Sequence, residues 1–215
     1  MNVAEGVTNR RKKNGETHSA AAGEEPRAVS DPLVEARRRA VEEPENVEAR
    51  MGLAQLYMDR GDTELAIEQL NAARATAPEN VSVLVELGVA LRIAGRAKES
   101  EKELRRAQRL DPERPRVHSQ LGVLLFKRGL YRQAEAELSR AIELDDRDGE
   151  AYFYRGEALN QLGRLDDALE MLERAVQYQP RNAKAYYTMG ILYDRKHLSQ
   201  EAATMYRKAR EVGAA

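Results

Sequence analysis

Residues 149–182 read GEAYFYRGEALNQLGRLDDALEMLERAVQYQPRN, and the stretch contains the pattern of two amphipathic helices in succession. The residues that recur at helical spacing on one face are, in the first helix, Tyr152, Arg155, Gly156 and Leu159, and in the second, Leu165, Ala168, Leu169, Leu172, Ala175 and Val176. Between the helices, Gly163 can adopt the left-handed conformation that ends a helix. Pro180 ends the second helix, and Asn182 suits the cap of the next one. The stretch therefore predicts a helical hairpin.

The same helix-ending and turn residues recur along the chain every 34 residues, which indicates a repeat architecture. The positions that end the second helices are Pro44, Pro78, Pro112, Asp146 and Pro180. The positions between the two helices of a hairpin are Gly61, Gly95, Gly129, Gly163 and His197. His tolerates a positive φ better than most residues, so we expect the last turn to keep the same geometry.

Small residues follow the same period and predict close contacts between helices. One series consists of Ala54, Gly88, Gly122, Gly156 and Gly190. Two further series are Ala66, Ser100, Ala134, Ala168 and Ala202, and Ala73, Ala107, Ala141, Ala175 and Ala209. A larger side chain at such a point would overpack the interface, at a cost of about 1–3 kcal/mol.

With this series of small, large and proline positions, the sequence resembles the tetratricopeptide repeat family. Five units match, at residues 47–80, 81–114, 115–148, 149–182 and 183–215. The chain departs from the pattern where Arg155 and Met189 replace a leucine, where Asp146 replaces a proline and where His197 replaces a glycine. The resemblance implies an all-α, right-handed solenoid of antiparallel helix pairs.

The remaining segments lie before the repeats. Residues 1–30 lack aromatic side chains and are expected to form a disordered tail, in which the run from Arg10 to Lys13 is either a solvated charge cluster or a weak anchor for an anionic surface. Residues 31–46 are predicted to form an N-terminal capping helix, with Asp31 as its cap and Pro32 in its first turn.

Composition narrows the class of function. The formal net charge is −1, which provides no general attraction to nucleic acid, and there is no Cys for disulfide, thiolate-metal or thiol chemistry. No apolar run is long enough to span a bilayer and no signal-peptide core follows Met1, so we expect a cytoplasmic protein without an integral membrane segment.

The resemblance implies that the first helix of each unit lines a concave groove. The groove positions are Met51, Gln55, Met58, Val85, Glu86, Val89, Ile93, Ser119, Val123, Phe126, Phe153, Tyr154, Glu157, Tyr187, Ile191 and Asp194. Some of the aliphatic ones can instead pack between helices. Eight of the eleven aromatic residues follow residue 150, so we expect Phe153, Tyr154 and Tyr187 to be the main anchors for an apolar helix or extended peptide of a partner protein.

The two ends of the array differ in charge, which leaves a second function open. Residues 31–80 contain six basic and eleven acidic residues, whereas residues 183–215 contain six basic and three acidic residues. Head-to-tail association of such ends would form a homo-oligomer and a structural platform.

Other classes of function find little support in the sequence. The three histidines are scattered, Asp145, Asp146 and Asp148 do not have the spacing of a calcium loop, and no phosphate-binding glycine loop is present, so neither an enzyme nor a cofactor is expected. The basic residues from Arg96 to Arg109 alternate with glutamates, and i,i+4 pairing explains them better than nucleic-acid binding. The groove also lacks the Lys and Asn positions with which family members hold chaperone tails.

Overall fold

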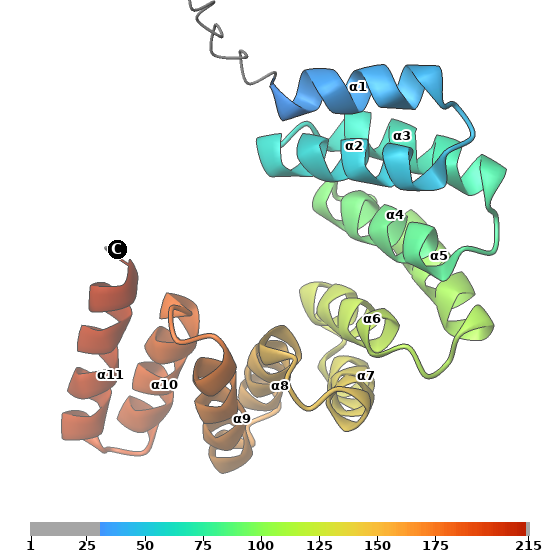
Figure 1. The fold of residues 1–215 in the computed structure, drawn as a ribbon. Helices are drawn as coiled ribbons and strands as arrows, with labels where there is room; N and C mark the ends of the chain where they lie inside the picture. The colour runs from blue at the N-terminus through green and yellow to red at the C-terminus, as the bar shows by residue number, and fades with distance from the viewer. Residues whose placement is uncertain (1–30, 214–215) are drawn as a thin grey trace, which may run out of the picture. The chain divides into compact units, whose positions relative to one another are not determined.

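The structure is a computed structural model in which residues 31–213 are described. The expected tail at residues 1–30, with its basic run, lies outside the described residues. All secondary structure in residues 31–213 is helical, so the expected all-α fold is confirmed (Figure 1). Helix α1 (Pro32–Glu42) precedes five helix pairs. The first helices of the pairs are α2 (Val47–Arg60), α4 (Val81–Ile93), α6 (Pro115–Lys127), α8 (Gly149–Gln161) and α10 (Ala183–Arg195). The second helices are α3 (Thr63–Thr76), α5 (Ala97–Leu110), α7 (Tyr131–Leu144), α9 (Leu165–Tyr178) and α11 (Ser199–Gly213).

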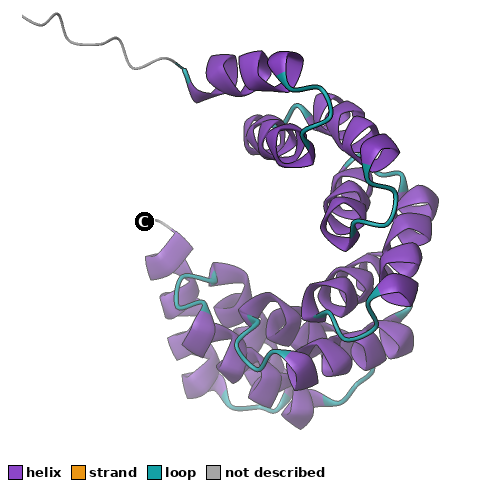
Figure 2. Ribbon diagram, turned by 45° about the vertical axis from the view of Figure 1, so that its right-hand side comes forward, coloured by secondary structure: helices purple, strands orange, loops and turns teal. Residues whose placement is uncertain are grey.

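The helix pairs stack one on the next along a curved stack of helices (Figure 2), and contacts between the first helices form a continuous row. Within the described residues, α2, α4, α6 and α8 each pack closely against the next first helix, whereas the backbones of successive second helices lie farther apart. Rows of helices that touch lie on the inner side of a curved stack. The shared face of the first helices is therefore the concave one.

Side-chain caps explain where most first helices begin. The caps are Asn46, Asn80, Asp148 and Asn182, and each accepts a hydrogen bond from the backbone N–H three residues later. Helix α6 begins instead with Pro115, whose missing N–H needs no partner in the first turn. The cap expected at Asn182 is thus present.

The turns inside the helix pairs have the predicted left-handed geometry. Gly61, Gly95, Gly129 and Gly163 have φ between 76° and 82°. His197 has a φ of 60° at the equivalent place in the last pair. In the described part of the chain, His197 is the only non-glycine residue with positive φ. Because a side chain disfavours this left-handed backbone conformation, the turn at His197 is strained.

The small residues of the first helices lie where the second helix comes closest. A Cβ atom added to Gly122 would lie 2.4 Å from Cγ of Leu138, and one added to Gly156 would lie 2.8 Å from Cγ of Leu172. Both leucines are fully buried. Close approach therefore depends on the absence of a side chain at these positions.

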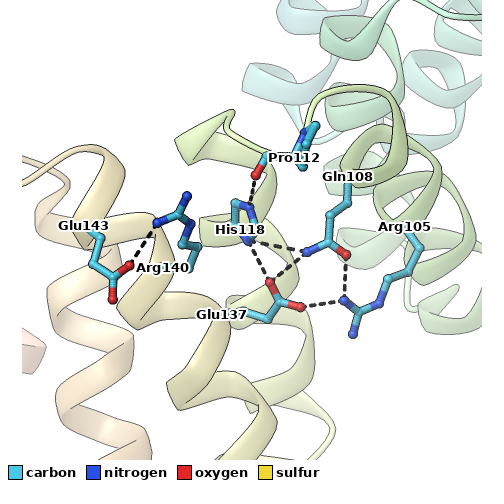
Figure 3. Close-up of polar contacts among 7 residues, drawn as sticks. All are labelled: Arg105, Gln108, Pro112, His118, Glu137, Arg140 and Glu143. Atoms are coloured by element: carbon cyan, nitrogen blue, oxygen red, sulfur yellow. Dashed lines mark hydrogen bonds and ion pairs between the residues drawn. The ribbon is translucent and has the colours of Figure 1, made fainter.

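Polar side chains also tie neighbouring pairs together, most extensively around Glu137 of α7 (Figure 3). Its carboxylate accepts a hydrogen bond from Arg105 of α5 and lies 2.8 Å from Nδ1 of His118 on α6. The other ring nitrogen of His118 donates to the carbonyl oxygen of Pro112 at 2.8 Å. The cluster joins three consecutive helices, and it gives the buried His118 a structural role.

Charged residues form further contacts between helices. Arg155 replaces a packing leucine, and its guanidinium reaches Glu135, with Nη2 2.9 Å from Oε1. The i,i+4 pairs expected on α5 are not among its ion pairs: Glu99 pairs with Arg96 three residues before it, whereas Glu101 pairs with Arg128 and Glu103 pairs with Arg74. Two of its glutamates thus contribute to contacts between helix pairs.

Among residues 31–213, no helix is both long and apolar enough to cross a membrane.

Candidate protein-binding groove

Five aromatic rings converge at the C-terminal part of the concave face and line one pocket. They are Phe126, Phe153, Tyr154, Tyr187 and Tyr206. The pocket has a volume of about 550 Å³, within the range of about 300–1,000 Å³ that is usual for ligand sites. Both phenylalanines of the chain and three of its nine tyrosines thus lie at this place, which we call the aromatic pocket.

Four helices position these rings. Phe126 lies at the end of α6, Phe153 and Tyr154 lie on α8, Tyr187 on α10 and Tyr206 on α11. Tyr154 contacts Phe126 and Phe153, with ring centroids 5.5 Å and 5.0 Å away, and Tyr187 lies 5.5 Å from Tyr206. Most of these rings are half-buried, but Tyr187 is 57% exposed. The rings support one another and still leave an open apolar surface.

Tyr206 is held in place by its neighbours on α10. A Cβ atom on Gly190 would lie 2.5 Å from the Tyr206 ring, so the ring needs a glycine at that position. Its hydroxyl donates to Asp194 at 2.7 Å, and this hydrogen bond raises the pKa of Tyr206 to about 12. The ring therefore faces the pocket in a fixed orientation, with its hydroxyl un-ionised at neutral pH.

One carboxylate lies among the apolar walls. Burial raises the pKa of Glu157, against the opposing effects of a hydrogen bond with Thr188 and of the charge of Lys127. Oε1 of Glu157 is buried and has no hydrogen-bond partner. A buried acceptor without a partner is costly, so this atom favours an occupant that donates a hydrogen bond.

A second, smaller pocket of about 310 Å³ lies on the first helices near the N-terminal end of the row. Its lining includes the expected groove residues Met51, Gln55, Met58, Glu86, Val89 and Ile93. Arg116 at its edge is paired with Glu86, with Nη2 2.7 Å from Oε1. We call it the methionine pocket.

Polar side chains also connect three of the first helices that line the two pockets. Arg92 of α4 donates to Gln120 of α6 at 3.2 Å, and Gln120 donates to Glu150 of α8 at 3.3 Å. These hydrogen bonds link three successive first helices on the concave side.

The predicted groove residues fall into four groups. Those that line the aromatic pocket are Phe126, Phe153, Tyr154, Glu157 and Tyr187. Those that line the methionine pocket are Met51, Gln55, Met58, Glu86, Val89 and Ile93. Val85 and Val123 are buried at 1% and 0% exposure, so they pack between helices and present no surface to a partner, and Ser119 is buried as well. Ile191 is half-buried and Asp194 is exposed, and neither lines these two pockets.

Several lining residues were not predicted. They are Lys127, Ala183, Lys184, Thr188, Tyr206, Ala209 and Arg210. The repeat could have indicated Thr188, because it lies 34 residues after Tyr154. Tyr206 and Arg210 lie on a second helix, whereas the family resemblance implies groove positions on first helices only.

The described residues contain no group of three His, Cys, Asp or Glu side chains placed to hold a metal ion. The acidic cluster near Asp148 is a turn in which Asp145 accepts the backbone N–H of Arg147 and Asp148 caps α8.

Comparison with known proteins identifies a family match and several solved structures with a similar fold. Residues 10–215 match the family model described as the cilia and flagella-associated protein 70 C-terminal domain. Among solved structures, MamA is 26% identical with a TM-score of 0.64, over 75% of this chain and 95% of that one. YrrB, described as a tetratricopeptide repeat protein with an unusual peptide-binding site, is 25% identical with a TM-score of 0.60, over 85% of this chain and 92% of that one. The Cut9–Hcn1 structure, at 17% identity and a TM-score of 0.78, covers 84% of this chain and 36% of that one and shares the fold alone.

No curated protein matches the chain significantly. The repeat pattern, the row of stacked helix pairs and the family match agree. The chain therefore belongs to the tetratricopeptide repeat proteins, in the family described as the cilia and flagella-associated protein 70 C-terminal domain.

Proposed function

We propose that this interaction scaffold captures an apolar helix or extended segment of another protein on its concave face, with the aromatic pocket as the principal binding site. The observation that carries the proposal is the convergence of five aromatic rings on one open pocket of about 550 Å³. Aromatic side chains bury a large area at a low cost in side-chain entropy, and they dominate the energy of protein interfaces.

Phe153, Tyr154 and Tyr187 are the proposed anchors. Their rings reach the pocket from adjacent first helices, so one bound segment can touch all three. YrrB, which shares this kind of scaffold, is described as having a peptide-binding site, and this supports a peptide or protein segment as the occupant. The methionine pocket offers a second apolar contact for a partner long enough to reach it.

Selection from a displayed library of random peptides tests the proposal on the full chain. Peptides enriched on the protein should bind the triple variant Phe153→Ala/Tyr154→Ala/Tyr187→Ala at least about tenfold more weakly, as measured by fluorescence anisotropy. Circular dichroism of the variant should show unchanged helical content.

A single substitution gives a sharper comparison, since it leaves the half-buried rings in place. Tyr187→Ala removes a ring that is 57% exposed and lies in the pocket. Tyr178→Ala is the matched control, because this tyrosine is 39% exposed on α9 and lies outside the pocket. Equal affinity of the two variants for the selected peptides would refute the site.

Self-association is the second candidate, and one observation favours it. Val34 and Val41 are 58% and 79% exposed, and their spacing of seven residues places them on one face of α1, at the acidic end of the array. A second copy could cover them with its basic C-terminal end. Light scattering should then report a mass that rises with concentration and falls in Val34→Glu/Val41→Glu, whereas a monomer under all conditions would exclude this function.

A further inference from the structure

The aromatic pocket has a one-sided distribution of charge. Lys127, Lys184 and Arg210 lie around it, and Glu157 is the one carboxylate among its lining residues. Among the ion pairs of the described residues, none involves these three cations. In the methionine pocket, by contrast, Arg116 is already paired with Glu86. Three cations at the aromatic pocket thus remain available to an anionic partner.

The position of Lys127 is set by the rings beside it. Its ammonium lies 5.9 Å from the centroid of Phe126 and 5.6 Å from that of Tyr154, which is within the range of cation–π attraction. Rings that hold the ammonium at the pocket wall reduce the entropy that it would lose on binding a carboxylate. A partner carboxylate that reaches this wall would lie next to the apolar surface.

Glu157 does not oppose an acidic partner strongly. Burial raises the pKa of its carboxyl group, which favours the uncharged form, and Lys127 lies close enough to compensate the charged form. Its unpartnered Oε1 atom can accept a hydrogen bond from a backbone amide or a side-chain donor of the occupant. The interior of the aromatic pocket therefore suits an apolar group next to an N–H donor. Its rim, formed by Lys127, Lys184 and Arg210, suits carboxylates.

We infer that the occupant is an acidic segment of a partner protein, with an apolar side chain among the five rings and carboxylates against Lys127, Lys184 and Arg210. This inference rests on the function proposed above and specifies the chemistry of the partner. Charge complementarity at the rim contributes mainly to specificity and association rate, while the rings supply most of the affinity.

Two measurements on the full chain test the inference. First, the random peptide library selected on the wild-type protein should enrich sequences that combine Asp or Glu with Leu, Phe, Trp or Tyr. Second, reversal of the rim charges in Lys127→Glu/Lys184→Glu/Arg210→Glu should weaken binding of the enriched peptides by about tenfold or more. The three side chains are exposed, so the fold should tolerate their reversal.

A matched control variant distinguishes the effect of charges at the aromatic pocket from the effect of the net charge of the protein. Lys98→Glu/Lys102→Glu/Arg109→Glu changes the net charge by the same amount, at exposed positions of α5 away from the pocket. We expect it to retain most of the affinity in 0.15 M salt, where charges more than about 8 Å apart are screened.

The outcomes distinguish the two proposals. Enriched peptides that are neutral or basic, or an equal loss of binding in both charge-reversal variants, would overturn the acidic partner and leave the aromatic pocket standing. If no enriched peptide loses affinity in Tyr187→Ala, the proposed function itself fails, together with this inference.

Discussion

Substitution of two glycines by alanine tests whether the packing of the helix pairs depends on missing side chains. Gly122→Ala adds a methyl group where α6 meets α7, and Gly52→Ala adds the same group on an exposed part of α2. Both glycines lie inside helices, so both substitutions gain about the same helix propensity, roughly 1 kcal/mol. The difference between the two variants therefore measures packing alone.

The structure sets the size of that difference. At Gly122 the new Cβ would lie 2.4 Å from Cγ and 2.8 Å from Cδ2 of Leu138, and 3.3 Å from the carbonyl oxygen of Ala134. Leu138 is fully buried, so it cannot turn away without disturbing other neighbours. Overpacking of this kind costs about 1–3 kcal/mol. At Gly52 nothing lies within 4 Å, and only the gain in propensity remains.

Urea unfolding followed by circular dichroism at 222 nm measures the effect. Gly52→Ala should raise the free energy of unfolding by roughly 1 kcal/mol, and Gly122→Ala should fall about 1–3 kcal/mol below it. The reasoning would be refuted if Gly122→Ala were as stable as Gly52→Ala, because close contact at the small positions would then have no energetic meaning.

Three further predictions concern caps, turns and pH. Asp148→Ala removes the hydrogen bond to the N–H of Ala151, and it should lower the free energy of unfolding by about 1 kcal/mol, whereas Asp148→Asn should restore most of the loss. His197→Gly removes a side chain from a turn with a φ of 60°, so it should raise the free energy of unfolding by about 1 kcal/mol, and a destabilised variant would contradict the strain assigned to this turn. Burial raises the pKa of Glu137, but its hydrogen bonds with His118, Arg105 and Gln108 together outweigh burial and hold the pKa below its ordinary value. A lowered carboxyl pKa adds stability above the pKa of the unfolded chain, and this stability is lost as the pH falls through the folded-state pKa. Thermal unfolding from pH 7 to pH 3 should accordingly be less steeply pH-dependent in Glu137→Gln, and unchanged steepness would contradict this role.

The fold was predictable to a large extent because its signals are local. A cap such as Asn182, a turn such as Gly163 and the apolar stripes between them act over a few residues, and repetition every 34 residues makes each weak signal reliable. The candidate site was less predictable. Val85 and Val123 have the same apolar character as exposed groove residues, and only their neighbours bury them.

Sequence alone determined that the chain forms helices of these lengths, with their caps, left-handed turns and small contact positions, because each depends on residues near one another in the chain. The tertiary structure decided which distant side chains meet. Phe126 and Arg210 lie at one pocket although many residues separate them, and His118 contacts Glu137 on another helix. These contacts between distant residues depend on how each helix pair is rotated relative to the next. That rotation is set by packing across the whole stack.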